Sequence, residues 1–99
     1  MNEKCSCERK KVRSEEEYKK LINRLNRIEG QIRGIKKMVE SDAYCIDILT
    51  QSSAASAALN AFNRELLGDH IRTCVRGDIL SGDDTSTDEL IETLRLLVR

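Results

Sequence analysis

Residues 21–39 read LINRLNRIEGQIRGIKKMV, and this stretch decides the fold class of the chain. Its apolar residues recur at alternating steps of four and three, and they are Leu21, Leu25, Ile28, Ile32, Ile35 and Val39. This heptad-type spacing puts the apolar side chains on one face of an α-helix that packs against other helices. Ser14 stands before three glutamates and forms a capping-box pattern with Glu17, so we expect the first helix to run from about residue 15 to about Glu40.

A second, longer helix is expected over residues 43–80, which contain no proline. Ser41 or Asp42 is positioned to cap its start. The middle of the segment is rich in alanine and serine, which indicates either close contact with another helix or simply a high helix propensity. Gly68 and Gly77 are expected to kink this helix or to end it early.

The polar turn SGDDTSTD at 81–88 precedes an apolar stripe that predicts a short third helix, capped by Thr85 or Thr87. The chain has 99 residues, no proline, 34% charged residues and only three aromatic side chains, a composition that favours an all-α fold. A single domain of this size buries a modest core, so self-association is plausible. We expect a disordered basic tail over 1–14 and one domain over 15–99.

The N-terminal stretch MNEKCSCERKKVR lacks the apolar core of a secretory signal, and no run approaches the ~20 apolar residues of a membrane span. These features predict a cytoplasmic protein with no membrane partner. Four cysteines in a reducing cytosol more often indicate metal or redox chemistry than structural disulfides. An enzyme is not expected, because the chain has one histidine, no Gly-rich phosphate loop and no obvious pair of catalytic carboxylates.

The segment DHIRTC at 69–74 holds His70 and Cys74 about one helical turn apart, which is half of a soft-metal site. The third candidate ligand, Cys45, lies 25 residues before His70, which is roughly 37 Å along a straight helix. One chain cannot join them, but an antiparallel twofold dimer can, with two identical sites between subunits. Two thiolates and one imidazole suit Cu(I), whereas a fourth ligand would favour zinc, nickel or cobalt. The alternative is a buried free cysteine with an exposed histidine.

The charge of the chain is formally zero but unevenly distributed. Residues 1–40 carry 12 Lys/Arg against 7 Asp/Glu, and residues 41–99 carry 5 against 10. A basic first half suggests a polyanionic partner such as DNA, although an inert dipolar surface is the simpler alternative. The candidate phosphate contacts are Lys20, Arg24, Arg27, Arg33, Lys36 and Lys37, with Arg64 on the second helix as an addition.

Three segments together resemble the CsoR family of copper-sensing repressors, namely NRLNRIEGQIRGI at 23–35, AYCIDILTQSSA at 43–54 and DHIRTC. The resemblance covers roughly residues 15–99, and the family's Cys–His–Cys signature falls on Cys45, His70 and Cys74. It implies three-helix protomers that form antiparallel helical-bundle dimers and then dimer-of-dimers tetramers. It also implies a repressor whose metal-free form binds operator DNA. Cu(I), held in trigonal geometry across the dimer interface, would release the DNA and derepress genes for copper export or homeostasis.

The same resemblance implies roles for residues around the metal. Tyr44 matches a tyrosine of the copper-sensing members, and Glu89 best matches a third-helix glutamate that is linked to the ligand histidine, with Glu92 a weaker match. A carboxylate in that place fixes the histidine tautomer and raises its basicity, whereas the alternative is that both glutamates are solvated. Arg24 matches a family arginine implicated in DNA binding, but another basic family position is Ala61 here.

Several alternatives to a copper sensor stay open. A nickel-sensing type of the family shares Cys–His–Cys but adds an N-terminal histidine, which Cys5 or Cys7 would have to replace here. A thiol or persulfide redox switch could link Cys45 and Cys74 of opposing chains, and a metal store would leave the basic half unexplained. The pair Cys5 and Cys7 can bind soft metals and receive copper from a chaperone partner, or be incidental thiols of a flexible tail.

Overall fold

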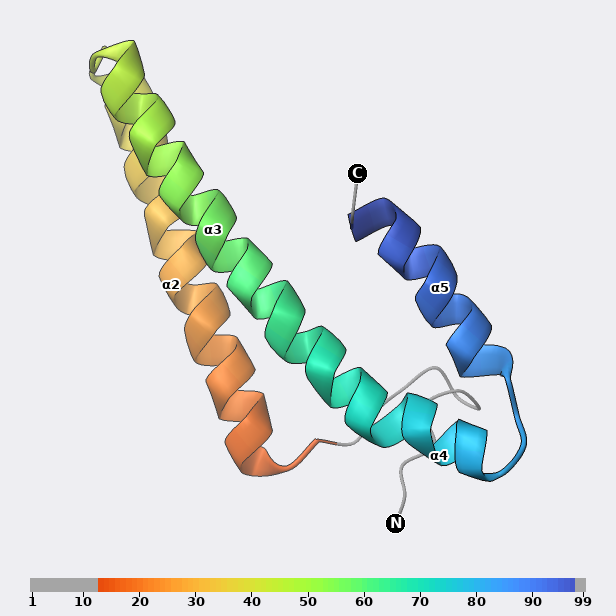
Figure 1. Ribbon diagram of the computed structural model, residues 1–99. Coiled ribbons are helices and arrows are strands. Elements are labelled where there is room, and N and C mark those ends of the chain that lie inside the picture. The colour runs from red at the N-terminus through yellow and green to blue at the C-terminus, as the bar shows by residue number, and fades with distance from the viewer. Residues whose placement is uncertain (1–12, 98–99) are drawn as a thin grey trace. The chain divides into compact units, whose positions relative to one another are not determined.

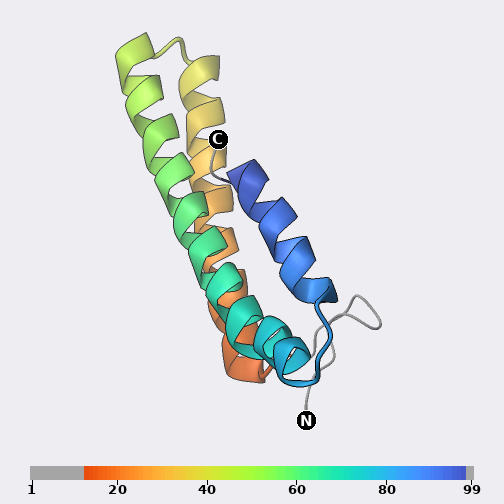
Figure 2. The same ribbon diagram turned by 45° about the vertical axis from the view of Figure 1, so that its right-hand side comes forward.

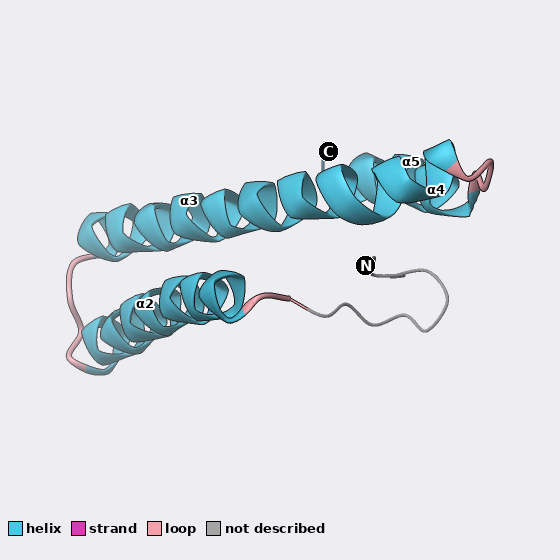
Figure 3. Ribbon diagram, turned by 90° about the horizontal axis from the view of Figure 1, so that it is seen from below, coloured by secondary structure: helices cyan, strands magenta, loops and turns pink. Residues whose placement is uncertain are grey.

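The computed structural model describes residues 13–97, and in this range every element is helical (Figures 1 and 3). The elements are α2 (Glu15–Glu40), α3 (Cys45–His70), the π-helical segment η1 (Ile71–Val75), α4 (Arg76–Leu80) and α5 (Thr85–Leu97). His70 and Arg76, which flank η1, both have right-handed helical backbone angles. The second helix therefore continues from Cys45 to Leu80 through a change of helix type, and the prediction of three helices is confirmed. Most of the predicted tail lies outside the described residues.

The start of α2 has the predicted capping box. The Ser14 hydroxyl accepts a hydrogen bond from the Glu17 N–H at 3.1 Å, and the Glu17 carboxylate accepts one from the Ser14 N–H at 3.3 Å. Both bonds satisfy backbone donors that the first helical turn leaves without partners. Glu15, Glu16 and Glu17 also place negative charge at the positive end of the helix.

The residues after α2 end that helix and do not cap the next one, so the prediction for Ser41 and Asp42 is wrong. The N–H of Ala43 donates to the Met38 carbonyl at 2.9 Å, and the N–H of Asp42 donates to the Val39 carbonyl at 3.1 Å. This pair of bonds is a Schellman motif, whose key residue must be left-handed. Asp42 takes that place with φ of 58°, a conformation that aspartate tolerates better than most residues.

The end of α4 repeats this motif with Gly82 at the left-handed position, where φ is 85°. The N–H of Asp83 donates to the Asp78 carbonyl at 2.8 Å, and that of Gly82 donates to the Ile79 carbonyl at 3.1 Å. The helix therefore continues past Gly77 to Leu80, and neither Gly68 nor Gly77 ends it.

The start of α5 also differs from the sequence-based expectation. Thr85 is already inside the helix, because the Asp84 carbonyl accepts the first helical bond, from the Asp88 N–H at 3.0 Å. The Asp83 carboxylate accepts from the Thr85 N–H at 2.9 Å. The cap position is therefore Asp84, and the prediction of a threonine cap at Thr85 or Thr87 is wrong, because both threonines lie inside the helix.

The chain divides into two compact units, Arg13–Leu66 and the segment from Leu67 onward. In the first unit, α2 and α3 run antiparallel and side by side (Figures 1 and 2). Leu21 and Ile28 of α2 and Ala55 of α3 are buried, so one small residue of the alanine-rich stretch lies in the core. In the second unit Cys74, Val75 and Ser86 are buried. The single domain expected over 15–99 stays a prediction.

Much of the apolar seam of α2 is not covered by the described chain. Leu21 and Ile28 are buried, but Ile32 and Val39 are each 57% exposed. Within residues 13–97, none of the helices combines the length and the apolar character that crossing a bilayer requires.

Candidate metal centre and nucleic-acid interface

Cys45 is the first residue of α3, and its thiol is free and exposed. The preceding Tyr44 is also exposed, and its carbonyl accepts hydrogen bonds from the N–H groups of Asp47 and Ile48. Cys45 is therefore accessible to a metal ion or to a second protein chain.

His70 and Cys74 lie at the opposite end of the same helix. His70 is the last residue of α3, and Cys74 belongs to η1 and is only 3% exposed. A π-turn closes with i→i+5 bonds, so residues four apart in it still project in nearly the same direction. Cys74 is disulfide-bonded in this structure, and a disulfide must be reduced before its sulfur can bind a metal as a thiolate.

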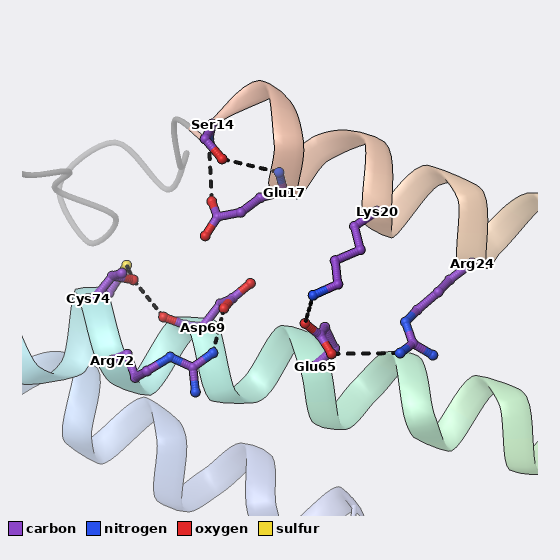
Figure 4. Close-up of polar contacts among 9 residues, drawn as sticks. Ser14, Glu17, Lys20, Arg24, Glu65, Asp69, Arg72 and Cys74 are labelled. Atoms are coloured by element: carbon purple, nitrogen blue, oxygen red, sulfur yellow. Dashed lines mark hydrogen bonds and ion pairs between the residues drawn. The ribbon is translucent and has the colours of Figure 1, made fainter.

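Local polar contacts stabilise the DHIRTC segment (Figure 4). The Arg72 guanidinium binds the Asp69 carboxylate at 2.7 Å, and the Thr73 hydroxyl donates to the Asp69 carbonyl at 2.7 Å. The Thr73 hydroxyl also lies 3.7 Å from the Cys74 sulfur. A Cβ added at Gly68 would lie 3.2 Å from a nitrogen of Arg72, so this glycine leaves room for the guanidinium. These contacts fix the backbone on which His70 and Cys74 are placed.

Residues 13–97 contain no cluster of three or more His, Cys, Asp or Glu side chains that could hold a metal ion. The length of α3 explains this, since its first and last residues are Cys45 and His70, roughly 37 Å apart along a straight helix. A single chain therefore does not bring the three predicted ligands together. The intersubunit site stays a prediction.

A pocket of about 570 Å³ beside His70 is lined by one face of α5. Its lining residues are Leu67, His70, Asp88, Glu89, Leu90, Glu92 and Thr93. Both glutamates expected near the histidine thus lie around the same cavity. Glu92 is exposed and pairs with Arg95 at 3.5 Å, whereas Glu89 is half-buried, and a bond from either of them to His70 stays a prediction. Sequence reasoning missed Asp88, whose position directly before Glu89 was the available signal. Tyr44, at the other end of α3, does not line this pocket.

The predicted DNA-binding side chains lie mostly on the exposed surface of α2. Arg27, Arg33, Lys36, Lys37 and, on α3, Arg64 are exposed. Lys20 and Arg24 instead share a carboxylate that the sequence analysis did not identify. The Glu65 carboxylate of α3 binds the Lys20 ammonium at 3.2 Å and the Arg24 guanidinium at 3.8 Å (Figure 4). This contact joins α2 to α3, and no spacing along the chain could have revealed it.

Comparison with known families gives a match over residues 17–96 to the metal-sensitive transcriptional repressors. The chain belongs to this family. Its members are regulators of transcription, so this protein is a transcriptional repressor of a non-enzymatic class. The match spans α3, η1 and α4 and nearly all of α2 and α5.

Individual relatives in the repressor family are also similar over most of their length. The copper-sensing transcriptional repressor CsoR of Bacillus subtilis (strain 168) is 46% identical over 84 residues, which are 84% of this chain and 83% of that protein. The copper-sensing transcriptional repressor RicR of Mycobacterium tuberculosis (strain ATCC 25618 / H37Rv) is 42% identical over 77% of this chain and 79% of its own.

Two solved structures have the same fold. The copper-sensing repressor CsoR with Cu(I) from Geobacillus thermodenitrificans NG80-2 is 43% identical, with a TM-score of 0.85 over 89% of this chain and 93% of that chain. The nickel-responsive transcriptional regulator InrS is 39% identical, with a TM-score of 0.72 over 88% of this chain and 99% of its own. The all-α fold expected from the sequence is confirmed.

Proposed function

We propose that this repressor senses Cu(I), and that its metal-free form binds operator DNA while Cu(I) binding releases it. The observation that carries the proposal is the donor set Cys45, His70 and Cys74 in a member of the family. Two thiolates and one imidazole form a soft ligand set that suits Cu(I). A relative of 43% identity has been solved with Cu(I), which supports the same choice of metal.

Each site is assembled from two chains. Cys45 at the start of α3 meets His70 and Cys74 of a second subunit, and twofold symmetry produces two equal sites per dimer. The exposed apolar side chains of α2 and α3 supply the surface for this dimer, and dimers pair into tetramers. Glu89 accepts a hydrogen bond from the ring N–H of His70 that faces away from the metal, and Tyr44 lies beside the Cys45 ligand.

DNA is held by the basic side chains of the α2 face, through contacts with phosphates. These contacts supply salt-sensitive affinity, and they contain no sequence code by themselves. Cu(I) binding pulls the ends of two α3 helices together. The basic faces of α2 then no longer match the positions of the phosphates along the duplex. Linkage then requires DNA and Cu(I) to weaken each other's binding by the same factor.

The protein acts in the cytoplasm, where its DNA is found, and it controls genes for copper export or homeostasis. Oxidation of Cys74 removes one ligand, so the sensor needs the reducing conditions of that compartment. The Cys5–Cys7 pair lies outside the described residues and is an accessory route by which a copper chaperone delivers the metal.

The first prediction concerns release of DNA. We expect one Cu(I) per protomer to lower the affinity of the reduced protein for its operator by about 5- to 150-fold. The operator is a duplex selected from random sequences by the metal-free protein, and binding is followed by fluorescence anisotropy. Cys45→Ala should abolish the response, because it removes the ligand that links the two subunits. His70→Ala should blunt the response while it spares Cu(I) affinity more than Cys45→Ala does.

The controls separate copper from the alternatives. Ni(II) and an inorganic persulfide are titrated in the same assay, and a Cys5→Ser/Cys7→Ser variant should still bind one Cu(I) per protomer. Unchanged DNA affinity on saturation with Cu(I) would contradict the proposal. Release by Ni(II) alone would assign the protein to nickel sensing, and release by persulfide alone would assign it to thiol chemistry.

A further inference from the structure

A single carboxylate of α3 lies between two cations of the proposed DNA-binding face. Glu65 uses one oxygen for the Lys20 ammonium at 3.2 Å and the other for the Arg24 guanidinium at 3.8 Å (Figure 4). The Glu65 side chain is only 27% exposed. It therefore lies between α2 and α3 with both of its oxygens directed at basic groups on the neighbouring helix.

Lys20 and Arg24 are four residues apart on α2, so one carboxylate can contact both. A phosphate group of DNA offers the same cations the same kind of anionic oxygens. The carboxylate and a phosphate cannot both take the best position against one ammonium group. Although each cation has further N–H donors, a carboxylate already paired with both of them offsets part of the charge that attracts a phosphate, so the two anions compete.

We propose that Glu65 is an internal competitor of DNA phosphate for Lys20 and Arg24, and that it sets the affinity of the repressor for DNA. This inference rests on the proposed DNA-binding function. It explains why two residues of the basic face are neutralised within the protomer, whereas Arg27, Arg33, Lys36 and Lys37 have no salt bridge within residues 13–97. An effector releases the repressor by binding its DNA-free state more tightly than its DNA-bound state. If DNA binding is weaker, a smaller ratio of these two effector affinities is enough for release.

The test replaces the carboxylate by an amide of the same shape, Glu65→Gln. Each exposed ion pair has a modest strength, so loss of both competing pairs should tighten DNA binding by about five-fold at low salt. Binding of the reduced, metal-free protein is measured with the selected operator duplex and with a duplex of unrelated sequence. The Glu65→Gln variant should bind both duplexes more tightly, because phosphate contacts do not depend on sequence.

Glu29→Gln is the matched control, because it makes the same change of charge at an exposed position of α2. Glu29 has no salt bridge within residues 13–97. Its effect on DNA affinity should be clearly smaller than that of Glu65→Gln. Circular dichroism melts of all variants check that the helices are intact.

A comparison with a variant that lacks both cations shows whether Glu65 acts through Lys20 and Arg24. In a Lys20→Gln/Arg24→Gln background, Glu65→Gln should leave DNA affinity unchanged. An equal gain in that background, or a gain matched by Glu29→Gln, would show a general charge effect and overturn the inference. Weaker DNA binding by Glu65→Gln would show that the carboxylate positions the cations and does not compete for them. If the unaltered protein bound neither duplex, the proposed function itself would fail, and the inference with it.

Discussion

Within residues 13–97, Asp42 is the one residue other than glycine whose φ is positive. It stands at the left-handed position that ends α2, with φ of 58°, whereas the equivalent position after α4 is Gly82. A Cβ makes this conformation costly, and glycine adopts it without that cost. The ends of α2 and α4 therefore have the same hydrogen-bond pattern, but glycine suits the left-handed position better than aspartate does.

We expect Asp42→Gly to raise the free energy of unfolding by up to about 1 kcal/mol, because the left-handed strain is relieved. Gly82→Ala should lower it by about 1 kcal/mol for the opposite reason. Both are measured by urea denaturation at one protein concentration, so that self-association does not differ between samples. A lower free energy of unfolding in Asp42→Gly would show that the aspartate side chain stabilises the protein by more than the left-handed strain destabilises it.

At the scale of elements, α2 shows how local bonds define a helix. Its apolar seam sets where the helix can run, and the capping box between Ser14 and Glu17 sets where it begins. This start also places Lys20 about one and a half turns and Arg24 about two and a half turns into the helix, opposite Glu65 of α3. The cap therefore stabilises the part of α2 that we assign to DNA binding.

Ser14→Ala should lower the free energy of unfolding by about 1 kcal/mol, since it leaves the Glu17 N–H without its acceptor. Glu17→Gln is the control, because glutamine also serves in a capping box, and it should cost only a few tenths of a kcal/mol. Chemical denaturation followed by circular dichroism measures both. A larger loss in Glu17→Gln than in Ser14→Ala would indicate that the charge of Glu17, and not the cap, stabilises the start of α2.

At the scale of the whole molecule, few apolar side chains of the described residues are buried and many large ones are exposed. The described residues bury Leu21, Ile28, Ala55, Cys74 and Val75, whereas large apolar side chains such as Ile32, Val39, Ile46 and Leu49 are more than half exposed. Groups of exposed apolar side chains are commonly found where proteins bind partners. The proposed dimer would cover these side chains, and stability would then depend on protein concentration.

Ile32→Glu should weaken self-association, because it places a charge in the exposed apolar seam of α2. Sedimentation velocity should show a smaller species at equal concentration, and the melting temperature should fall. Arg33→Glu introduces the same side chain at the adjacent exposed position and should leave the assembly unchanged. A monomer in the unaltered protein at all concentrations would contradict the assembly that the metal site requires.

The sequence by itself determined the features that depend on neighbours along the chain. The seam over 21–39, the capping box and the extent of the first helix follow from periodicity and from bonds over three or four residues. The donor set Cys45, His70 and Cys74 stays a prediction, and it rests on softness, which is a property of the side chains alone. The separation of Cys45 from His70 followed from helix length alone.

Only the tertiary structure decided which distant residues meet. The contact of Glu65 with Lys20 and Arg24 depends on how α2 lies against α3, and the pocket that joins His70 to Asp88 and Glu89 depends on the course of α5. The left-handed Asp42 was also missed, because Ser41 and Asp42 suit a helix start as well as a helix end. Spacing along the chain determines on which face of a helix a side chain lies. Which side chains of two different helices come into contact depends on how the helices pack.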